Sequence, residues 1–248
     1  MAQDEEEEIL SLRALTVERG GRRTIDRLDL GVRAGCVYAL LGGNGAGKTT
    51  TLNVFLGFVQ PASGEVRVAG FSPVREAPQV RRRLAYLPEN VALYPYLSGV
   101  ENLRYFCTLA GIALSRAAAR GLLERAGLQA PAHDARVSTY SKGMRQKVGL
   151  AIADAKEAQA MLLDEPTSGL DPGAANDFAR RIRAAADNGM AVLMATHDLF
   201  NARQVADRIG ILKEGRLVAE FDAHTVNHGE LEHAYLAHTR GGDPEARS

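Results

Sequence analysis

One stretch constrains the fold of this chain more than any other: residues 42–49, Gly-Gly-Asn-Gly-Ala-Gly-Lys-Thr. It fits G-x-x-x-x-G-K-[ST], the pattern of a phosphate-binding loop, in which glycines let successive backbone N–H groups point at phosphate oxygens. In this pattern the Lys48 ammonium reaches the β- and γ-phosphates of a nucleotide, and the Thr49 hydroxyl ligates Mg²⁺. The residues expected to bind the phosphates are Gly42, Gly43, Asn44, Gly45, Ala46, Gly47, Lys48, Thr49 and Thr50.

The segments on either side of this loop favour the same interpretation. Residues 36–41 form a short apolar run that predicts a buried strand, and residues 50–56 predict a helix that ends at Gly57. Strand, glycine loop and helix form the arrangement that phosphate binding needs, because the N-terminal end of a helix carries partial positive charge. A chance glycine-rich turn is the weaker interpretation once both flanks are counted.

Composition narrows the class of protein. The chain has 248 residues, 46% hydrophobic and 24% charged, which suits one α/β domain with an inserted subdomain. Lys and Arg number 30 and Asp and Glu number 30, so net charge gives no argument for nucleic-acid binding. Cys36 and Cys107 lack metal-ligand spacing, which favours buried, reduced thiols. No apolar run approaches the roughly 18 residues of a membrane span, and the acidic run 4–8 after Met1 predicts no signal peptide.

The first part of the chain is expected to open with antiparallel strands. Loose alternation predicts strands at residues 9–18 and 28–32, and a further strand is expected at residues 65–69. Residues 74–83 then predict a helix, and residues 84–87 a short strand that Pro88 ends.

The pattern changes at about residue 90, where helical spacing without strand alternation predicts a helical insert that ends at about residue 140. Residues 141–154 predict a helix with Ser141 as its N-cap. Strands and helices then alternate, as in a largely parallel sheet that binds ligands at the carboxyl ends of its strands. These later elements are expected at residues 160–163, 172–187, 190–196 and 199–206, and in a hairpin of 208–212 with 216–220.

Asp164 and Glu165 follow four apolar residues at the end of a predicted strand. Acidic side chains in this position fit a Mg²⁺ site that faces the nucleotide. We expect Asp164 to hold the metal through water, and Glu165 to orient or deprotonate the attacking water. For the pair alone, a plain charged strand end would be the simpler interpretation, but the phosphate-binding loop upstream favours the catalytic one.

With these motifs in place, the chain resembles the ATP-binding subunit of ABC transporters over about residues 10–221. The resemblance implies an α/β fold of the P-loop NTPase class, an ABC cassette. Such a cassette has a RecA-like core with a parallel sheet, an antiparallel β subdomain and a helical insert. Further segments stand in the family's order: Glu89 in the glutamine loop, residues 140–146 as the signature motif, residues 168–171 as the D-loop, and Thr196 with His197 as the switch.

The resemblance also implies roles for individual residues. Ser141 and Gly143 would contact the γ-phosphate of the nucleotide bound by the opposite subunit, so that two ATP molecules lie in a head-to-tail dimer. Asp171 would lie at the junction, and His197 would contact the γ-phosphate and help to place the water. The catalytic residues implied are Glu165, His197 and Lys48, and the Mg²⁺ ligands are Thr49, Glu89 and Asp164.

Several positions differ from the commonest pattern of the family. Arg19 stands where an aromatic residue usually stacks on adenine, and its planar guanidinium can also stack on a base. Glu89 replaces glutamine, Met144 replaces the signature glutamine, and Lys142 replaces the first signature glycine; Lys142 either adds charge near the phosphates or points to water. These departures are similar to those of type-2 exporter ATPases, which include drug, sodium and NosF-like copper-maturation exporters.

The resemblance therefore predicts an ATPase that uses ATP and Mg²⁺ and drives a separate integral-membrane permease, on the cytoplasmic face of the inner membrane. A homodimer is expected because both half-sites look complete, and no nucleic-acid partner is expected. A non-transport ABC ATPase and an ATP-binding module without turnover are the alternatives. The predicted divisions are an acidic tail at 1–8, the ABC domain at 9–222, and a C-terminal extension at 223–248 whose last residues, 241–248, are expected to be disordered.

Overall fold

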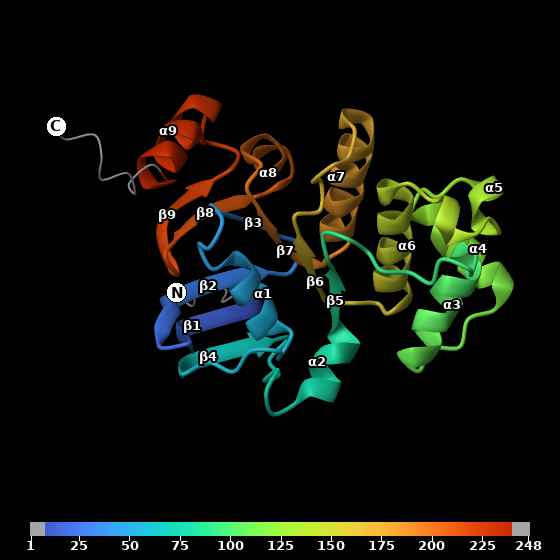
Figure 1. Cartoon of the computed structure of the whole chain (residues 1–248), viewed down its shortest axis with the longest axis horizontal. Helices are drawn as coiled ribbons and strands as arrows, with labels where there is room; N and C mark the ends of the chain where they lie inside the picture. The colour runs from blue at the N-terminus through green and yellow to red at the C-terminus, as the bar shows by residue number, and fades with distance from the viewer. Residues whose placement is uncertain (1–7, 240–248) are drawn as a thin grey trace, which may run out of the picture.

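A six-stranded sheet with the strand order β5-β6-β7-β3-β8-β9 forms the centre of the computed structural model, which describes residues 8–239 (Figure 1). The strands β5, β6, β7, β3 and β8 each run parallel to their neighbours, and the pair of β8 with β9 at the edge is antiparallel. The expectation of a largely parallel sheet is therefore confirmed. Its strands are β3 (Val37–Leu41), β5 (Leu84–Leu87), β6 (Ala160–Asp164), β7 (Ala191–Thr196), β8 (Arg208–Lys213) and β9 (Arg216–Asp222).

A smaller antiparallel sheet packs below the first, with the strand order β2-β1-β4 (Figure 1). Its strands are β1 (Glu8–Arg19), β2 (Arg22–Arg33) and β4 (Ser63–Val68). Strand β2 begins earlier than the predicted 28–32, directly after a turn in which Gly20 and Gly21 both have positive φ. The alternation was obscured because Arg27 also has a positive φ, 49°, which interrupts the regular register.

Helix α1 (Lys48–Phe55) packs against strands of both sheets. Leu52 and Phe55 on this helix are fully buried in a core that also contains Tyr38. Tyr38 is therefore a core residue, and its hydroxyl donates to Glu220 Oε1 at 2.9 Å. Helix α2 (Ala77–Arg83) is shorter than the predicted 74–83, because a proline occupies its first turn and the residues before it lie in a turn.

A group of helices forms the lobe drawn in green at the right of Figure 1. Its members are α3 (Gly99–Leu109), α4 (Arg116–Arg125), α5 (Ala130–His133) and a short 3₁₀ turn (Val137–Thr139), packed beside α6 (Lys142–Ala155). Ser98 and Glu101 form a capping box that begins α3. Cys107 on this helix is buried, which raises the pKa of its thiol to about 11, whereas Cys36 is only partly buried. The expectation of two buried thiols thus holds for Cys107 alone.

The last part of the chain contains α7 (Pro172–Asp187), α8 (Leu199–Val205) and α9 (His228–Thr239). The first two match the predicted ranges closely, because Asp171 and Asp198 cap them as good N-cap residues do. Helix α9 was not predicted, since its sequence carries no apolar stripe at helical spacing; Leu231 is its buried anchor. The sequence predicted an acidic tail at the N-terminus and disorder at the C-terminus. Residues 1–7 and 240–248, to which these predictions refer, lie outside the described residues. None of the described helices is long and apolar enough to pass through a bilayer.

Candidate nucleotide-binding and hydrolysis site

The carboxyl ends of three neighbouring strands bring the predicted site together. Leu41 at the end of β3 pairs with Thr196 at the end of β7, and Asp164 at the end of β6 pairs with Ala195. The glycine loop, Glu165 and His197 follow these strand ends directly and are therefore neighbours in space, at the edge where parallel sheets bind ligands.

The glycine loop has a backbone that side chains would not allow. Gly47 has a φ of 112°, and a Cβ there would lie 2.8 Å from Ile25 Cδ1 and 2.9 Å from the carbonyl oxygen of Thr24. A Cβ on Gly42 would lie 2.7 Å from the carbonyl oxygen of Leu212. By contrast, a Cβ on Gly43 or Gly45 would meet nothing within 4 Å, so this side of the loop is open. The glycines therefore both shape the loop and leave room beside it.

Helix α1 begins inside this loop and presents free backbone donors. Within residues 8–239, the N–H groups of Gly47, Lys48 and Thr49 have no hydrogen-bond partner, as at the start of most helices. Gly47 has no side chain that could cap them, and the Thr49 side chain is exposed. Free donors at the positive end of a helix, beside open space, fit an anionic phosphate group.

Lys48 is almost completely buried, with 9% of its side chain exposed. Its ammonium donates to the carbonyl oxygen of Gly42 at 2.6 Å and to that of Gly43 at 3.4 Å. The same nitrogen lies 3.6 Å from Glu165 Oε1. Lys48 is thus held beside the loop and connects it electrostatically to the acidic end of β6.

Glu165 adopts a left-handed backbone conformation, with a φ of 44°, which is unusual for a residue other than glycine. Its carboxylate accepts from the Thr196 hydroxyl at 3.0 Å and from the His197 backbone N–H at 3.3 Å. His197 Nδ1 lies 2.9 Å from the other carboxylate oxygen. Backbone strain of this kind persists only where the surroundings impose it, and here two adjacent residues and Lys48 hold the carboxylate in place.

Asp164 is partly buried beside these groups. Burial is the main cause that raises the pKa of its carboxyl group, the charges of Glu165 and Glu89 raise it further, and Lys48 opposes them. Among the described residues, no group of three or more His, Cys, Asp and Glu side chains could hold a metal by itself. Mg²⁺ commonly binds one or two carboxylates together with substrate phosphates, and the oxygen donors of Asp164 and Thr49 fit that mode.

The predicted signature and D-loop residues lie at the beginnings of two helices. Ser141 caps α6 by accepting from the Met144 N–H at 3.3 Å, and Asp171 caps α7 by accepting from the Ala174 N–H at 2.9 Å. A Cβ on Gly143 would lie at ordinary contact distance from Leu170 and Ala174. In the part of the chain that the structure describes, no hydrogen bond or ion pair joins Ser141, Gly143 or Asp171 to the glycine loop.

Three residues have positions that the sequence did not settle. Arg19 ends β1 with an exposed side chain. Lys142 does not point to water: its ammonium donates to the carbonyl oxygen of Ser168 at 2.6 Å and lies 3.7 Å from Glu89 Oε1. Glu89 also accepts from the Ser168 hydroxyl at 3.0 Å.

Sequence reasoning gave no role to two buried polar residues beside the site. Thr196 holds the Glu165 carboxylate, and Gln146 donates to the carbonyl oxygen of Pro166. Both stood inside motifs that had been recognised, but their burial of 99%, with only 1% exposed, depends on the fold. A polar residue within an apolar strand or helix was the only available signal.

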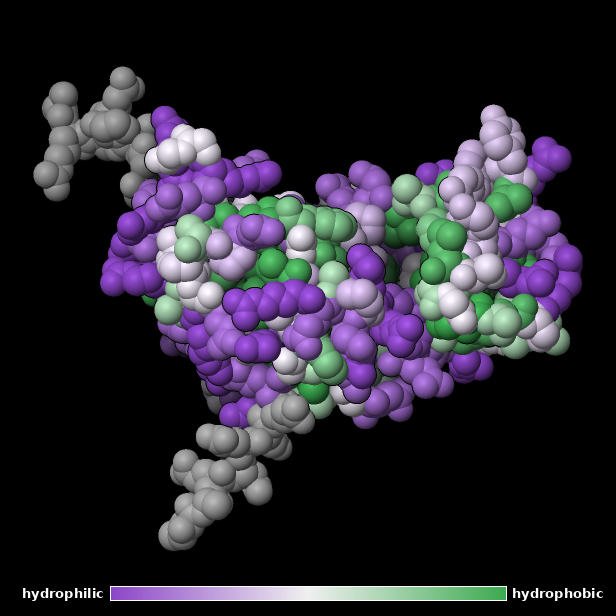
Figure 2. All heavy atoms as spheres, turned by 90° about the horizontal axis from the view of Figure 1, so that it is seen from below, coloured by the Kyte–Doolittle hydropathy of each residue, from purple (hydrophilic) through white to green (hydrophobic). Residues whose placement is uncertain are grey.

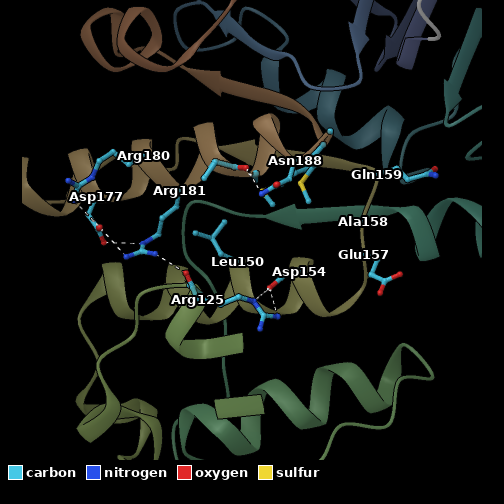
Figure 3. Close-up of a pocket in the computed structure, with 16 residues that line it drawn as sticks. Arg125, Leu150, Asp154, Glu157, Ala158, Gln159, Asp177, Arg180, Arg181 and Asn188 are labelled. Atoms are coloured by element: carbon cyan, nitrogen blue, oxygen red, sulfur yellow. Dashed lines mark hydrogen bonds and ion pairs between the residues drawn. The ribbon is translucent and has the colours of Figure 1, made fainter. Parts of the chain in front are cut away.

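A cavity of about 850 Å³ lies elsewhere, between α6 and α7 near the end of α4 (Figure 3). Its lining includes Gln159 and Met190, which directly precede β6 and β7, so it lies at the amino end of the sheet. The arginines around it pair with carboxylates, as Arg125 with Asp154 and Arg181 with Asp177 (Figure 3). This cavity therefore lacks the free donors that mark the glycine loop.

Comparison with known proteins supplies independent information. Residues 25–168 match the family described as ABC transporter. The chain is 40% identical over 202 residues to the daunorubicin/doxorubicin resistance ATP-binding protein DrrA of Streptomyces peucetius, covering 81% of this chain and 61% of that protein. It is 36% identical over 225 residues to the Nod factor export ATP-binding protein I of Cupriavidus metallidurans, covering 90% and 74%. A solved ATP binding subunit of an ABC transporter superposes with a TM-score of 0.79 at 28% identity, covering 92% and 99%.

Proposed function

Because this chain belongs to the ABC transporter family and is an ATP-binding subunit of that family, we propose that it hydrolyses ATP to power a separate membrane permease, as part of an exporter. The observation that carries the proposal is the cluster of Lys48, Glu165 and His197 beside a loop of free backbone donors. The export direction is supported by relatives named for drug resistance and for Nod factor export. The cargo is left open, since the chain spans 61% of one of these relatives and 74% of the other.

The glycine loop and Lys48 would bind the phosphates. The ammonium of Lys48 now donates to two carbonyl oxygens of the loop, and a phosphate is a stronger acceptor for it than either carbonyl. The free N–H groups at the start of α1 would donate to the same phosphates. The exposed Arg19 would cover the base by stacking its guanidinium on it.

Thr49 and Asp164 would hold Mg²⁺, whereas Glu89, which the sequence also suggested as a ligand, contacts Lys142 and Ser168 instead. Mg²⁺ held by Thr49 and Asp164 would supply positive charge that offsets the negative charge developing during phosphoryl transfer. Asp164 is suited to this task because it lies partly buried at the strand end, with Lys48 close enough to act on its charge.

Glu165 would act as the general base. A carboxylate that Thr196 and His197 hold in one orientation can accept a proton from a water that attacks the γ-phosphorus, and the products are ADP and phosphate. His197, with most of its side chain exposed, can turn from Glu165 toward the γ-phosphate and help to place that water.

A second copy of the chain would complete each site. Among the contacts of residues 8–239, none joins Ser141, Gly143 or Asp171 to the glycine loop of their own chain by a hydrogen bond or ion pair, so these residues can serve a nucleotide bound across an interface. One chain carries both kinds of half-site, which supports a homodimer. Nucleotide binding would favour the closed dimer and hydrolysis the open one, a switch between two arrangements.

An aromatic surface on the helical lobe would contact the permease. Tyr94, Tyr96 and Tyr105 are exposed, and the Tyr94 and Tyr105 rings meet edge to face with centroids 4.8 Å apart. Figure 2 shows apolar residues gathered on this lobe, at the right of the view. Exposed aromatic groups of this kind mark interaction sites. Contact with a permease through this surface would place the chain on the cytoplasmic face of the membrane.

The proposal is tested by measuring phosphate release from ATP by the purified chain and by its Glu165→Gln variant. The variant should lose at least about 100-fold in turnover, the usual contribution of a general base, and should elute as a dimer with ATP bound. A variant that hydrolyses ATP at the normal rate would refute the assignment of Glu165. A native protein that stays inactive even with its permease would indicate a binding module instead.

A further inference from the structure

Lys142 and Glu89 are each unfavourable in isolation. Lys142 is the first residue of α6, where a positive charge is repelled by the positive end of the helix, and the first turn of α6 contains no acidic residue to offset it. Glu89 adds a negative charge near the carboxylate of Asp164, which repels it. Each residue therefore needs a nearby charge of opposite sign.

The fold brings these two residues to each other. Lys142 Nζ lies 3.7 Å from Glu89 Oε1, and Ser168 joins both of them. The Ser168 carbonyl oxygen accepts from Lys142 at 2.6 Å, and the Ser168 hydroxyl donates to Glu89 at 3.0 Å. Three loops that are distant in the sequence thus meet at one point: the end of β5, the start of α6 and the segment after β6.

A second contact on the same helix supports this junction. Gln146 lies four residues after Lys142, so the two side chains share one face of α6. Gln146 is buried and donates to the carbonyl oxygen of Pro166, two residues before the acceptor of Lys142. The first turns of α6 therefore hold the segment 166–168 by alternate carbonyl groups.

We propose that Lys142 and Glu89 form a compensating charge pair that fixes the start of α6 against the segment that leads to Asp171. The pair keeps Ser141, Gly143 and Asp171 in the geometry that a facing subunit must meet, and in this sense the inference rests on the proposed function. Glu89 is then a positioning residue rather than the Mg²⁺ ligand that the sequence suggested.

The test is a double-mutant cycle with Glu89→Gln, Lys142→Gly and the two changes together, which isolates the pair because backbone effects of each change cancel. Glu124→Gln, an exposed carboxylate of α4, is the matched control. Three quantities are measured for every variant: the thermal unfolding midpoint without nucleotide, the ATP affinity of the monomer, and ATP-driven dimerisation in a Glu165→Gln background.

Each single change should lower the temperature of the unfolding midpoint. It should also weaken the dimerisation constant by roughly two- to five-fold, which is the range for a partly exposed ion pair. The double change should recover most of both losses, because no charge is left unpaired, and Lys142→Arg should retain dimerisation. Monomer ATP affinity should stay within about two-fold throughout, since the pair positions residues for the facing nucleotide.

Additive effects of the two substitutions on both unfolding and dimerisation would overturn the proposal. So would a Glu89→Gln change that raises the Mg²⁺ concentration needed for nucleotide binding equally with and without Lys142→Gly, because this would make Glu89 a metal ligand. If the proposed function fails, the result is different. The native chain would then not dimerise with ATP, while the unfolding midpoints would still show coupling between Glu89 and Lys142.

Discussion

Two charged clusters, one between α6 and α7 and one at the carboxyl end of the central sheet, use their side chains differently. Between α6 and α7, Asp177 accepts from Arg181 at 3.1 Å and pairs with Lys147 at 2.9 Å, beside the cavity in Figure 3. At the carboxyl end, Lys48 donates to carbonyl groups of its own loop beside free backbone donors, and Glu165 is held on a strained backbone. Charges that satisfy one another stabilise the fold, whereas free donors and strain mark a place prepared for a ligand.

This contrast predicts that substitutions at the carboxyl end change activity more than stability. Lys48→Ala should lower ATP turnover by roughly 100- to 1,000-fold, the usual cost of losing one charged group that stabilises a transition state. Its effect on the free energy of unfolding should be small, because a lysine at the first position of α1 is repelled by the positive end of the helix. Phosphate release and urea unfolding measure the two effects. Nucleotide affinity that survives this change would contradict the proposed role of the lysine.

Gly47→Ala should be the exception at the carboxyl end, because it should lower both stability and nucleotide binding. The φ of 112° and the 2.8 Å approach to Ile25 make any Cβ costly, so we expect a loss of about 1–3 kcal/mol in the free energy of unfolding. Nucleotide affinity should fall as well, because the loop must shift to relieve the contact. Gly43→Ala is the matched control, since a Cβ there meets nothing within 4 Å and φ is not positive. Equal stability of the two variants would show that the loop is not strained at Gly47.

Asp177→Asn should do the reverse of Lys48→Ala: it should lower stability and leave ATP turnover unchanged. It removes the carboxylate that Lys147 and Arg181 share between α6 and α7, and hydrogen bonds to charged groups predict a loss of about 1–2 kcal/mol in the free energy of unfolding. ATP turnover per folded molecule should stay unchanged, because this residue lies away from the glycine loop. The comparison of the two charged clusters would fail if turnover fell while stability did not.

The smallest predicted effect is the pH dependence of the same contact. Burial tends to raise the pKa of Asp177, but Lys147 and Arg181 outweigh it and lower the pKa to about 2 from 3.8. The lowered pKa means that the carboxylate stabilises the folded state above about pH 4, and that this contribution is lost as the pH falls toward 2. The difference in unfolding midpoint between the native chain and Asp177→Asn should therefore narrow below pH 4. A difference that is constant from pH 7 to pH 3 would show that the ion pairs do not stabilise the fold.

Much of the fold was predictable because its signals are local. The glycine loop, the apolar run before it and the capping residue Ser141 predicted strands and helices close to the observed bounds. Elements without a local signal were missed or shortened: α9 has no apolar stripe, and the bulge at Arg27 hid the first half of β2. Local patterns report period and caps, which depend on residues a few positions apart.

The sequence by itself determined the family, the order of the motifs and the residue types of the site. Only the tertiary structure decided which of those residues meet: Lys48 with Glu165, Thr196 with Glu165, and Lys142 with Glu89. These pairs are joined by the order and register of the strands, which bring distant segments to one edge of the sheet. The physical reason is that the residue type fixes the charge of a side chain, whereas its neighbours depend on how the whole chain packs.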